Sequence, residues 1–274
     1  MFEKFSLKGR LALVTGGGTG LGYHMSRALA QAGAKVLISA RRADVLEAAA
    51  AKLNAEPGVS NVSWHVVDLN NRDSIKALAA HAAGLGGVDI FIGNAGQDFN
   101  EHILDIKNSS IDQIMQVNVS ANVELVRAFV PHMRAQQWGR ILFSSSASTV
   151  VTSPHEGICM YTATKGALNA LARTLATELG HDNITANAMV IGFFHTDLTR
   201  EAEELLRRTQ GEEAAKAFLR DFVGMTALGR AGDPTELEGL IQLLASDAGS
   251  YITGANLAID GGMTIMLRPN GTAD

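Results

Sequence analysis

A glycine-rich turn near the amino terminus constrains the fold of this chain more than any other feature. The apolar run 11–14 leads into Thr15-Gly16-Gly17-Gly18-Thr19-Gly20-Leu21-Gly22, and a helical pattern over residues 21–32 follows. Such a turn needs glycine where the backbone takes positive φ and where a ligand approaches the bare main chain. The spacing of Gly16, Gly20 and Gly22 differs from the commonest dinucleotide fingerprint. Its place between a strand and a helix nevertheless predicts a cradle for the phosphates of a nucleotide.

Short apolar runs alternate with longer helical patterns along the rest of the chain. Expected strands cover residues 11–14, 36–39, 62–67, 88–93, 140–143, 184–190 and 256–259, and expected helices cover residues 21–32, 43–54, 75–83, 111–133 and 158–179. Strands that are apolar throughout have both faces covered. The alternation therefore predicts an α/β fold, a single domain over residues 1–274 with a Rossmann-type, doubly wound parallel β-sheet flanked by helices.

One charge-rich helical segment, residues 199–222, interrupts this alternation after the sixth expected strand. Ligands bind beyond the carboxyl ends of the strands in such sheets. We expect a substrate lid over residues 193–224, with a solvated surface excursion as the alternative.

The bulk composition excludes several classes of protein. Hydrophobic residues make up 46% of the 274 residues and charged residues 19%, which is ordinary for a globular domain. The net charge of −5, without a dense basic stretch, argues against nucleic acid as a partner. No apolar run approaches the ~18 residues of a membrane span, and no signal-peptide layout is seen. The single Cys159 suits a reducing compartment, and the eight histidines lack metal-binding spacing, so we expect a cytoplasmic protein without a metal site.

A second informative feature is the pair Tyr161 and Lys165, one turn apart in the expected helix 158–179. Residues four apart share a helix face. A free tyrosine has a pKa near ~10, and a neighbouring ammonium group lowers that pKa by stabilising the phenolate. Such a pair moves protons near neutral pH. Together with the nucleotide cradle, it indicates hydride transfer between a nicotinamide cofactor and a carbonyl.

The end of the second expected strand favours one cofactor. The strand ends Ser39-Ala40-Arg41-Arg42, and no acidic residue precedes Asp44. A carboxylate here would bind the adenosine ribose of NAD, whereas a guanidinium accepts the 2′-phosphate of NADP and stacks on adenine. We therefore expect NADP rather than NAD, with two solvated arginines as the alternative.

Taken together, the motifs resemble those of the short-chain dehydrogenase/reductase family from residue 7 to about residue 263. The motifs are the glycine turn, Asn94-Ala95-Gly96, Asn118, the run Ser144-Ser145-Ser146, and Tyr161-x-x-x-Lys165. The resemblance implies an NADP(H)-dependent oxidoreductase that interconverts a secondary alcohol and a ketone, with Tyr161 as general acid/base.

The resemblance also implies roles for individual residues around the cofactor. It assigns the pyrophosphate turn to Gly16, Gly20 and Gly22 with the intervening Gly18, Thr19 and Leu21, the adenine contact to Asp68 and Leu69, the adenosine ribose to Asn94, Ala95 and Gly96, the nicotinamide carboxamide to Thr196, and the nicotinamide ribose to Lys165. The family's usual Pro-Gly after the sixth strand is Ile191-Gly192 here, so this cofactor loop is expected to be less rigid.

The same resemblance gives a catalytic set of Asn118, Ser146, Tyr161 and Lys165. Ser146 lies six residues after Arg140, the usual offset in the family, and Ser145 is the alternative. The spacing from Ser146 to Tyr161 indicates a small insertion in residues 152–158. Asn118 resembles the asparagine whose distorted backbone holds a proton-relay water, the alternative being an amide on a helix surface.

The substrate and the assembly stay open at this stage. Three short segments, residues 5–7, 194–199 and 260–263, resemble those of the gluconate 5-dehydrogenase-like branch, which implies a sugar acid or a polyol. A 3-oxoacyl thioester reductase and a non-catalytic NADP(H)-binding sensor are the alternatives. Family members are often tetramers, built through helices that correspond here to residues 108–133 and 158–179 together with the carboxyl-terminal strand region. The resemblance therefore implies a homotetramer, with a homodimer as the alternative.

Overall fold

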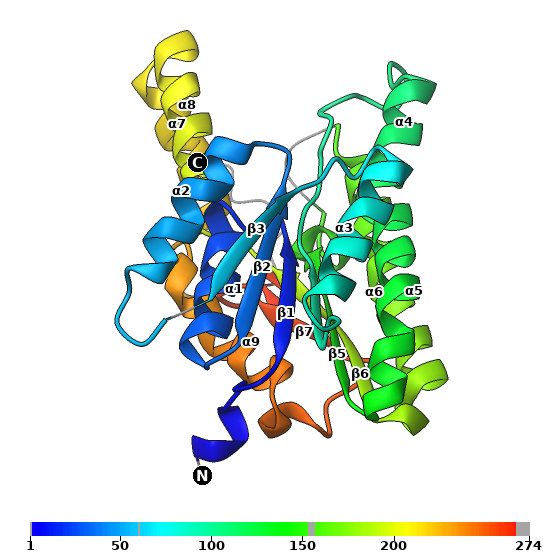
Figure 1. Ribbon diagram of the computed structural model, residues 1–274. Coiled ribbons are helices and arrows are strands. Elements are labelled where there is room, and N and C mark those ends of the chain that lie inside the picture. The colour runs from blue at the N-terminus through cyan, green and yellow to red at the C-terminus, as the bar shows by residue number, and fades with distance from the viewer. Residues whose placement is uncertain (1, 60, 153–156, 267–274) are drawn as a thin grey trace.

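The computed structural model describes residues 2–59, 61–152 and 157–266. Its centre is a seven-stranded parallel sheet in the order β3-β2-β1-β4-β5-β6-β7 (Figure 1). The strands are β1 (Leu11–Thr15), β2 (Lys35–Ala40), β3 (Val62–Val66), β4 (Ile90–Gly93), β5 (Gly139–Ser146), β6 (Ile184–Ile191) and β7 (Asn256–Ile259). The strand order reverses between β1 and β4, and the carboxyl ends on either side of such a point form the usual ligand crevice. The predicted doubly wound sheet is confirmed.

Helices cover both faces of the sheet, as the apolar strands require. One face is covered by α1 (Gly20–Gln31), α2 (Ala43–Asn54) and α9 (Glu238–Ala245), and the other by α3 (Arg72–Gly84), α5 (Ala121–Gln136) and α6 (Cys159–Leu179) (Figure 1). Each face has its own hydrophobic core. The sequence pattern did not predict α9. None of the helices within the described residues is long and apolar enough to cross a membrane.

The expected helix 111–133 is in fact three pieces. An α-helix, α4 (Asn108–Met115), passes through a π-helical turn (Gln116–Ser120) into α5. The π turn widens the backbone spiral locally, a distortion that is frequent at functional sites.

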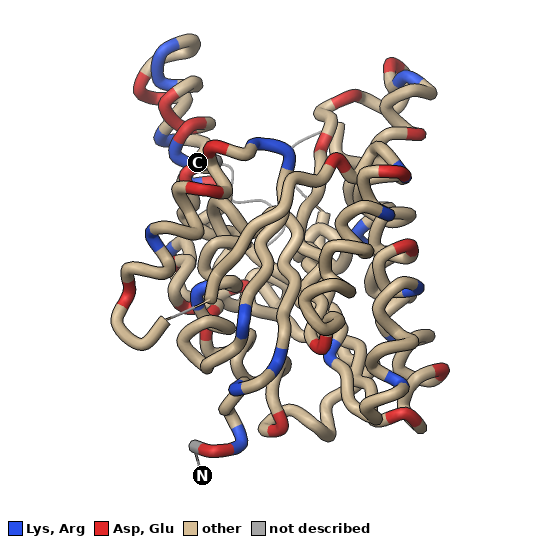
Figure 2. The backbone as a smooth tube through the Cα atoms, viewed as in Figure 1, with Lys and Arg blue, Asp and Glu red and all other residues tan. Residues whose placement is uncertain are grey.

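The charge-rich segment after β6 forms two helices, α7 (Asp197–Gln210) and α8 (Glu212–Val223). Gly211, at a φ of 97°, separates them, a conformation that glycine adopts without strain. Figures 1 and 2 show the pair projecting beyond the carboxyl edge of the sheet and carrying a dense mixture of acidic and basic residues. The expected site of an insertion, residues 152–158, lies mostly outside the described residues.

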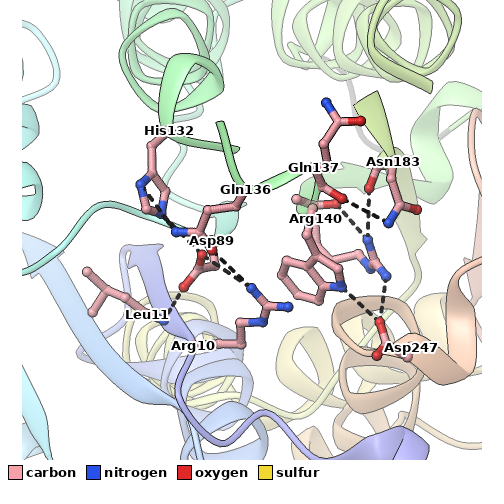
Figure 3. Close-up of polar contacts among 11 residues, drawn as sticks. Arg10, Leu11, Asp89, His132, Gln136, Gln137, Arg140, Asn183 and Asp247 are labelled. Atoms are coloured by element: carbon pink, nitrogen blue, oxygen red, sulfur yellow. Dashed lines mark hydrogen bonds and ion pairs between the residues drawn. The ribbon is translucent and has the colours of Figure 1, made fainter. Parts of the chain in front are cut away.

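The opposite, amino edge of the sheet is tied together by a buried arginine (Figure 3). Arg140, the second residue of β5, has no exposed surface. Its guanidinium lies 4.2 Å from the centre of the Trp138 ring and pairs with Asp247 at 3.1 Å. Burial lowers the pKa of Arg140 to about 10. Nearby, Asp89 accepts a hydrogen bond from the Leu11 amide at 2.8 Å. These contacts fix the amino ends of β1 and β5 at the edge away from the glycine turn.

Candidate active site

The glycine turn is built so that side chains cannot enter it. Gly16 and Gly20 have φ values of 67° and 51°. A Cβ added to Gly22 would lie 2.1 Å from the Gly16 carbonyl oxygen, which shows how closely α1 approaches the turn. The Asn94 side-chain amide donates to the Thr15 carbonyl at 3.0 Å and holds the turn from the β4 side. A bare backbone at the start of a helix fits the phosphates of a dinucleotide.

The other residues expected around the adenosine half of a cofactor gather at the same edge of the sheet. Arg41 and Arg42 follow β2 and are exposed. Asp68 and Leu69 follow β3, and Asp68 is exposed whereas Leu69 is buried. Ala95 donates its amide proton to Thr15 Oγ1 at 3.1 Å, which joins the end of β4 to the turn. These predicted residues therefore lie after neighbouring strands at one edge of the sheet, and their contact with a cofactor stays a prediction.

The segment after β6 reaches the glycine turn from the other side. Gly192 donates to the Ile259 carbonyl at 3.0 Å, and a Cβ on Gly192 would lie 2.5 Å from Asp260 Cα, so the loop is tightly packed despite lacking proline. Thr196 caps α7 through Thr199, and its Cβ is 3.9 Å from the Cβ position of Gly20. A cleft of about 630 Å³ lies beside this contact, lined by Gly18, Thr19, Gly20, Thr196 and Arg200 among others.

The three consecutive serines at the end of β5 have different partners. Ser144 Oγ donates to Asn94 Oδ1 at 3.1 Å, and Ser145 Oγ donates to the Lys165 carbonyl at 3.3 Å. Both hydroxyls are buried and committed to holding neighbouring segments. Ser146 is half-buried, and its Oγ accepts hydrogen bonds from the Ser148 amide at 3.2 Å and from Ser148 Oγ at 3.0 Å. It is the one of the three serines that acts on the pKa of Tyr161, which it lowers. The geometry thus favours Ser146 over Ser145 as the partner of the tyrosine.

Tyr161 and Lys165 lie on the same face of α6, with Lys165 Nζ 5.4 Å from the centre of the phenol ring. Burial raises the pKa of Tyr161, although the hydrogen bond from Ser146 acts to lower it. Burial also lowers the pKa of Lys165 to about 8. The ammonium donates to the Ser144 carbonyl at 2.7 Å rather than to the phenol oxygen. The expectation that Lys165 depresses the phenol pKa is therefore wrong for this structure, in which desolvation outweighs the neighbouring polar groups.

Asn118 lies in the π-helical turn and is 1% exposed, which excludes an amide on a helix surface. Its Oδ1 accepts the Gln97 amide proton at 2.8 Å, and its Nδ2 donates to the Gln97 carbonyl at 2.9 Å. Nδ2 also donates to Thr164 Oγ1 at 3.0 Å, and Thr164 Oγ1 donates to the Tyr161 carbonyl at 2.7 Å. One side chain thus joins the loop after β4 to the helix that carries the tyrosine.

Sequence reasoning missed three residues of this region, Gln97, Asp98 and Thr164. Thr164 follows Tyr161 by three positions, the spacing at which a threonine hydroxyl bonds back to the helix carbonyls. Asp98 contributes to the electrostatics of both Tyr161 and Lys165. Only its place two residues after Asn94-Ala95-Gly96 could have drawn attention to it.

Phe193, after β6, and Phe222, in α8, contact the segment that follows Ser146. Phe193 and Phe222 stack with ring centres 4.5 Å apart. They pack on a small apolar cluster that includes Ala147, the residue after Ser146. Phe193 and Phe222, near the two ends of the expected lid, therefore lie close to the segment after Ser146, and the substrate-covering role stays a prediction.

Comparisons with known proteins match this geometry. The family model described as short chain dehydrogenase matches residues 10–206. The chain is 33% identical over 261 residues to galactitol 2-dehydrogenase (L-tagatose-forming) of Cereibacter sphaeroides, covering 95% of this chain and 97% of the relative. It is 34% identical over 266 residues to gluconate 5-dehydrogenase of Gluconobacter oxydans (strain 621H), covering 97% and 98%.

A solved structure agrees with these relatives in fold. L-sorbose reductase from Gluconobacter frateurii, in complex with NADPH and L-sorbose, superimposes with a TM-score of 0.89 at 30% identity, covering 96% of this chain and all of that one. The glycine turn, the Ser146–Tyr161 contact and the extent of these matches lead to one conclusion: the chain belongs to the short-chain dehydrogenase family of oxidoreductases.

Proposed function

We propose that this protein is an NADP(H)-dependent oxidoreductase that interconverts a secondary alcohol and a ketone on a polyhydroxylated substrate. The observation that carries the proposal is the position of Tyr161 on α6, beside Lys165 and next to Ser146, at the carboxyl edge that also holds the glycine turn. The substrate class is supported by galactitol 2-dehydrogenase, gluconate 5-dehydrogenase and L-sorbose reductase, whose names all denote sugars, polyols or sugar acids.

The chain's own residues divide the work of proton transfer and orientation. NADPH, when bound, supplies the hydride. The Tyr161 hydroxyl donates a proton to the carbonyl oxygen of the substrate, and Ser146 Oγ donates a second hydrogen bond that orients this oxygen. Lys165, buried beside the phenol ring with its ammonium on the Ser144 carbonyl, would hold the nicotinamide ribose, as the family resemblance implies. Oxidation of the alcohol uses the same groups in reverse.

The preference for NADP rests on Arg41 and Arg42, which are exposed at the carboxyl end of β2. A guanidinium in this place can pair with a 2′-phosphate in two parallel hydrogen bonds. The L-sorbose reductase structure, which holds NADPH, supports the same choice. Replacing both arginines by alanine should lower kcat/KM for NADPH by at least about a hundredfold, and for NADH by much less, because each hydrogen bond to the charged phosphate contributes about 1.5–3 kcal/mol. A wild-type preference for NADH would contradict this assignment.

Tyr161→Phe tests the chemistry directly. The variant should lose nearly all ketone reduction yet still bind NADPH, as measured by cofactor fluorescence, because the change removes one hydroxyl and little volume. Ser146→Ala should lower kcat about 10²-fold, as loss of an oriented donor does. Tyr251→Phe is the matched control, since Tyr251 is fully exposed. Near-normal turnover by Tyr161→Phe would refute the mechanism, and NADPH binding without turnover of any ketone would favour a sensor.

Assembly and location belong to the same proposal. We propose a homotetramer or homodimer in the cytoplasm, on the basis of the family resemblance and the single cysteine. Within the interface region expected on α6, Leu168 is buried inside the monomer, whereas Leu171 and Leu175 are partly exposed. Light scattering measures the assembly directly, and a monomer would contradict it.

A further inference from the structure

The loop that joins β4 to α4 is held rigidly against the catalytic residues. Both the amide and the carbonyl of Gln97 are hydrogen-bonded by Asn118, at 2.8 and 2.9 Å. The Gln97 side chain also accepts a hydrogen bond from Gln113 Nε2 at 3.0 Å. A backbone fixed on both sides gives the next residue, Asp98, a defined position.

This fixed position is next to the buried lysine. A Cβ on Gly96 would lie 3.4 Å from Lys165 Nζ and 3.5 Å from Asn118 Oδ1, so the chain passes directly over the catalytic groups two residues before Asp98. The negative charge of Asp98 acts to raise the pKa values of both Lys165 and Tyr161. Among the charged side chains in the described part of the chain, Asp98 is the one that acts on both groups.

Asp98 is also accessible from outside. The residue is exposed, although partial burial of its carboxylate raises its pKa, an effect that the Phe99 amide acts against. A carboxylate offers about four acceptor positions, so it keeps capacity for a ligand. Glu101, the other acid in this loop, accepts hydrogen bonds from the Lys107 amide at 3.1 Å and from Ser110 Oγ at 3.0 Å, and thereby supports the start of α4.

The charge of Asp98 would distinguish neutral sugars and polyols from sugar acids, which carry a carboxylate. Hydroxyl groups donate hydrogen bonds to a carboxylate, and bonds to a charged acceptor are the stronger kind. A second carboxylate on the substrate would instead meet a like charge, which disfavours binding. Specificity then arises from both attraction and repulsion.

We propose that Asp98 is a specificity-determining residue that accepts hydrogen bonds from the hydroxyl groups of an uncharged polyhydroxy ketone or alcohol and excludes sugar acids. This inference rests on the proposed function and narrows its substrate class to neutral sugars and polyols.

The test uses two ketones that differ at one end only. L-Sorbose ends in a hydroxymethyl group where 5-keto-D-gluconate has a carboxylate. The wild-type enzyme with NADPH should show a higher kcat/KM for L-sorbose. Asp98→Asn, which keeps the shape and removes the charge, should narrow the ratio of the two kcat/KM values about tenfold. Asp105→Asn is the matched control, an exposed acid in the same loop, and should leave the ratio unchanged.

A binding measurement separates recognition from turnover. In the Tyr161→Phe background with NADPH bound, adding Asp98→Asn should tighten binding of 5-keto-D-gluconate about tenfold, as measured by quenching of the NADPH fluorescence. An unchanged ratio in Asp98→Asn, or a wild-type preference for the acid, would overturn the role of Asp98 and leave the proposed function standing. A lack of turnover with every ketone tested, despite NADPH binding, would overturn both.

Discussion

Replacing Lys165 by methionine should change how the stability of the cofactor-free protein depends on pH. Lys165 is 4% exposed, and burial lowers its pKa from 10.5 to about 8. In the unfolded chain the ammonium is hydrated and holds its proton more tightly. Because the unfolded state binds more protons than the folded state between these two pKa values, stability rises with pH in this window. The cost of burying the charge is fully present below pH 8 and is relieved as the pH rises towards 10.5.

The magnitude follows from the same two pKa values. Linkage gives almost no change between about pH 6 and pH 7.5, and a gain of about 2 kcal/mol in the free energy of unfolding between about pH 7.5 and pH 9.5. Methionine has a similar length and no charge, so the variant should lack this rise. The variant also leaves the Ser144 carbonyl without its 2.7 Å donor. That loss is independent of pH and shifts the whole curve without changing its shape.

Urea unfolding of both proteins at several pH values, at one protein concentration, measures the effect. The quantity to compare is the difference in the free energy of unfolding between wild type and Lys165→Met, because other titrating groups cancel in it. The difference should move in favour of wild type by about 2 kcal/mol across the upper window. A difference that stays flat would refute the argument that the buried ammonium has a lowered pKa.

Two further predictions concern groups that hold the site together. Gly22→Ala should abolish NADPH binding in a fluorescence titration, since its Cβ would lie 2.1 Å from the Gly16 carbonyl oxygen, whereas Gly239→Ala, with no atom within 4 Å, should bind normally. Asn118→Ala removes both hydrogen bonds to Gln97 and should lower the free energy of unfolding by about 1–3 kcal/mol in urea, because it leaves a partly buried donor and acceptor without their partner. An unaltered midpoint would show that water replaces the amide at little cost.

The sequence was sufficient to predict the sheet because its signals are local. The apolar run that becomes the buried strand β1 and the glycines that follow it can be read from the sequence without any tertiary information. In the structure, two of these glycines, Gly16 and Gly20, take positive φ. The edge strand β3 was found from its β-branched and aromatic residues even though Ser63, Trp64 and Val66 are exposed. The sequence pattern missed helix α9 because this helix has only eight residues and is mostly apolar. Its amino end also follows directly on a 3₁₀ turn, so no separate start signal marks it.

The pKa values of the site residues were harder to predict than which residues lie together in the site. Helical spacing correctly placed Tyr161 and Lys165 on one face, but it gave the wrong direction for the pKa shift of the phenol. The direction depends on burial and on the Ser144 carbonyl, which takes the lysine proton at 2.7 Å. Both arise from the packing of α6 on β5, a long-range contact that no local pattern contains.

The two edges of the sheet show why buried charge has different consequences in one fold. At the amino edge, Arg140 is fully buried, yet Asp247 and the Trp138 ring lie against it, and its lowered pKa of about 10 still leaves it charged at neutral pH. At the carboxyl edge, Lys165 is held by a neutral carbonyl, and its pKa of about 8 lies close to physiological pH. A group poised in this way responds to each charge brought near it. Asp98 is the accessible carboxylate that acts on it in the described part of the chain, so substrate selection and proton transfer share one electrostatic environment.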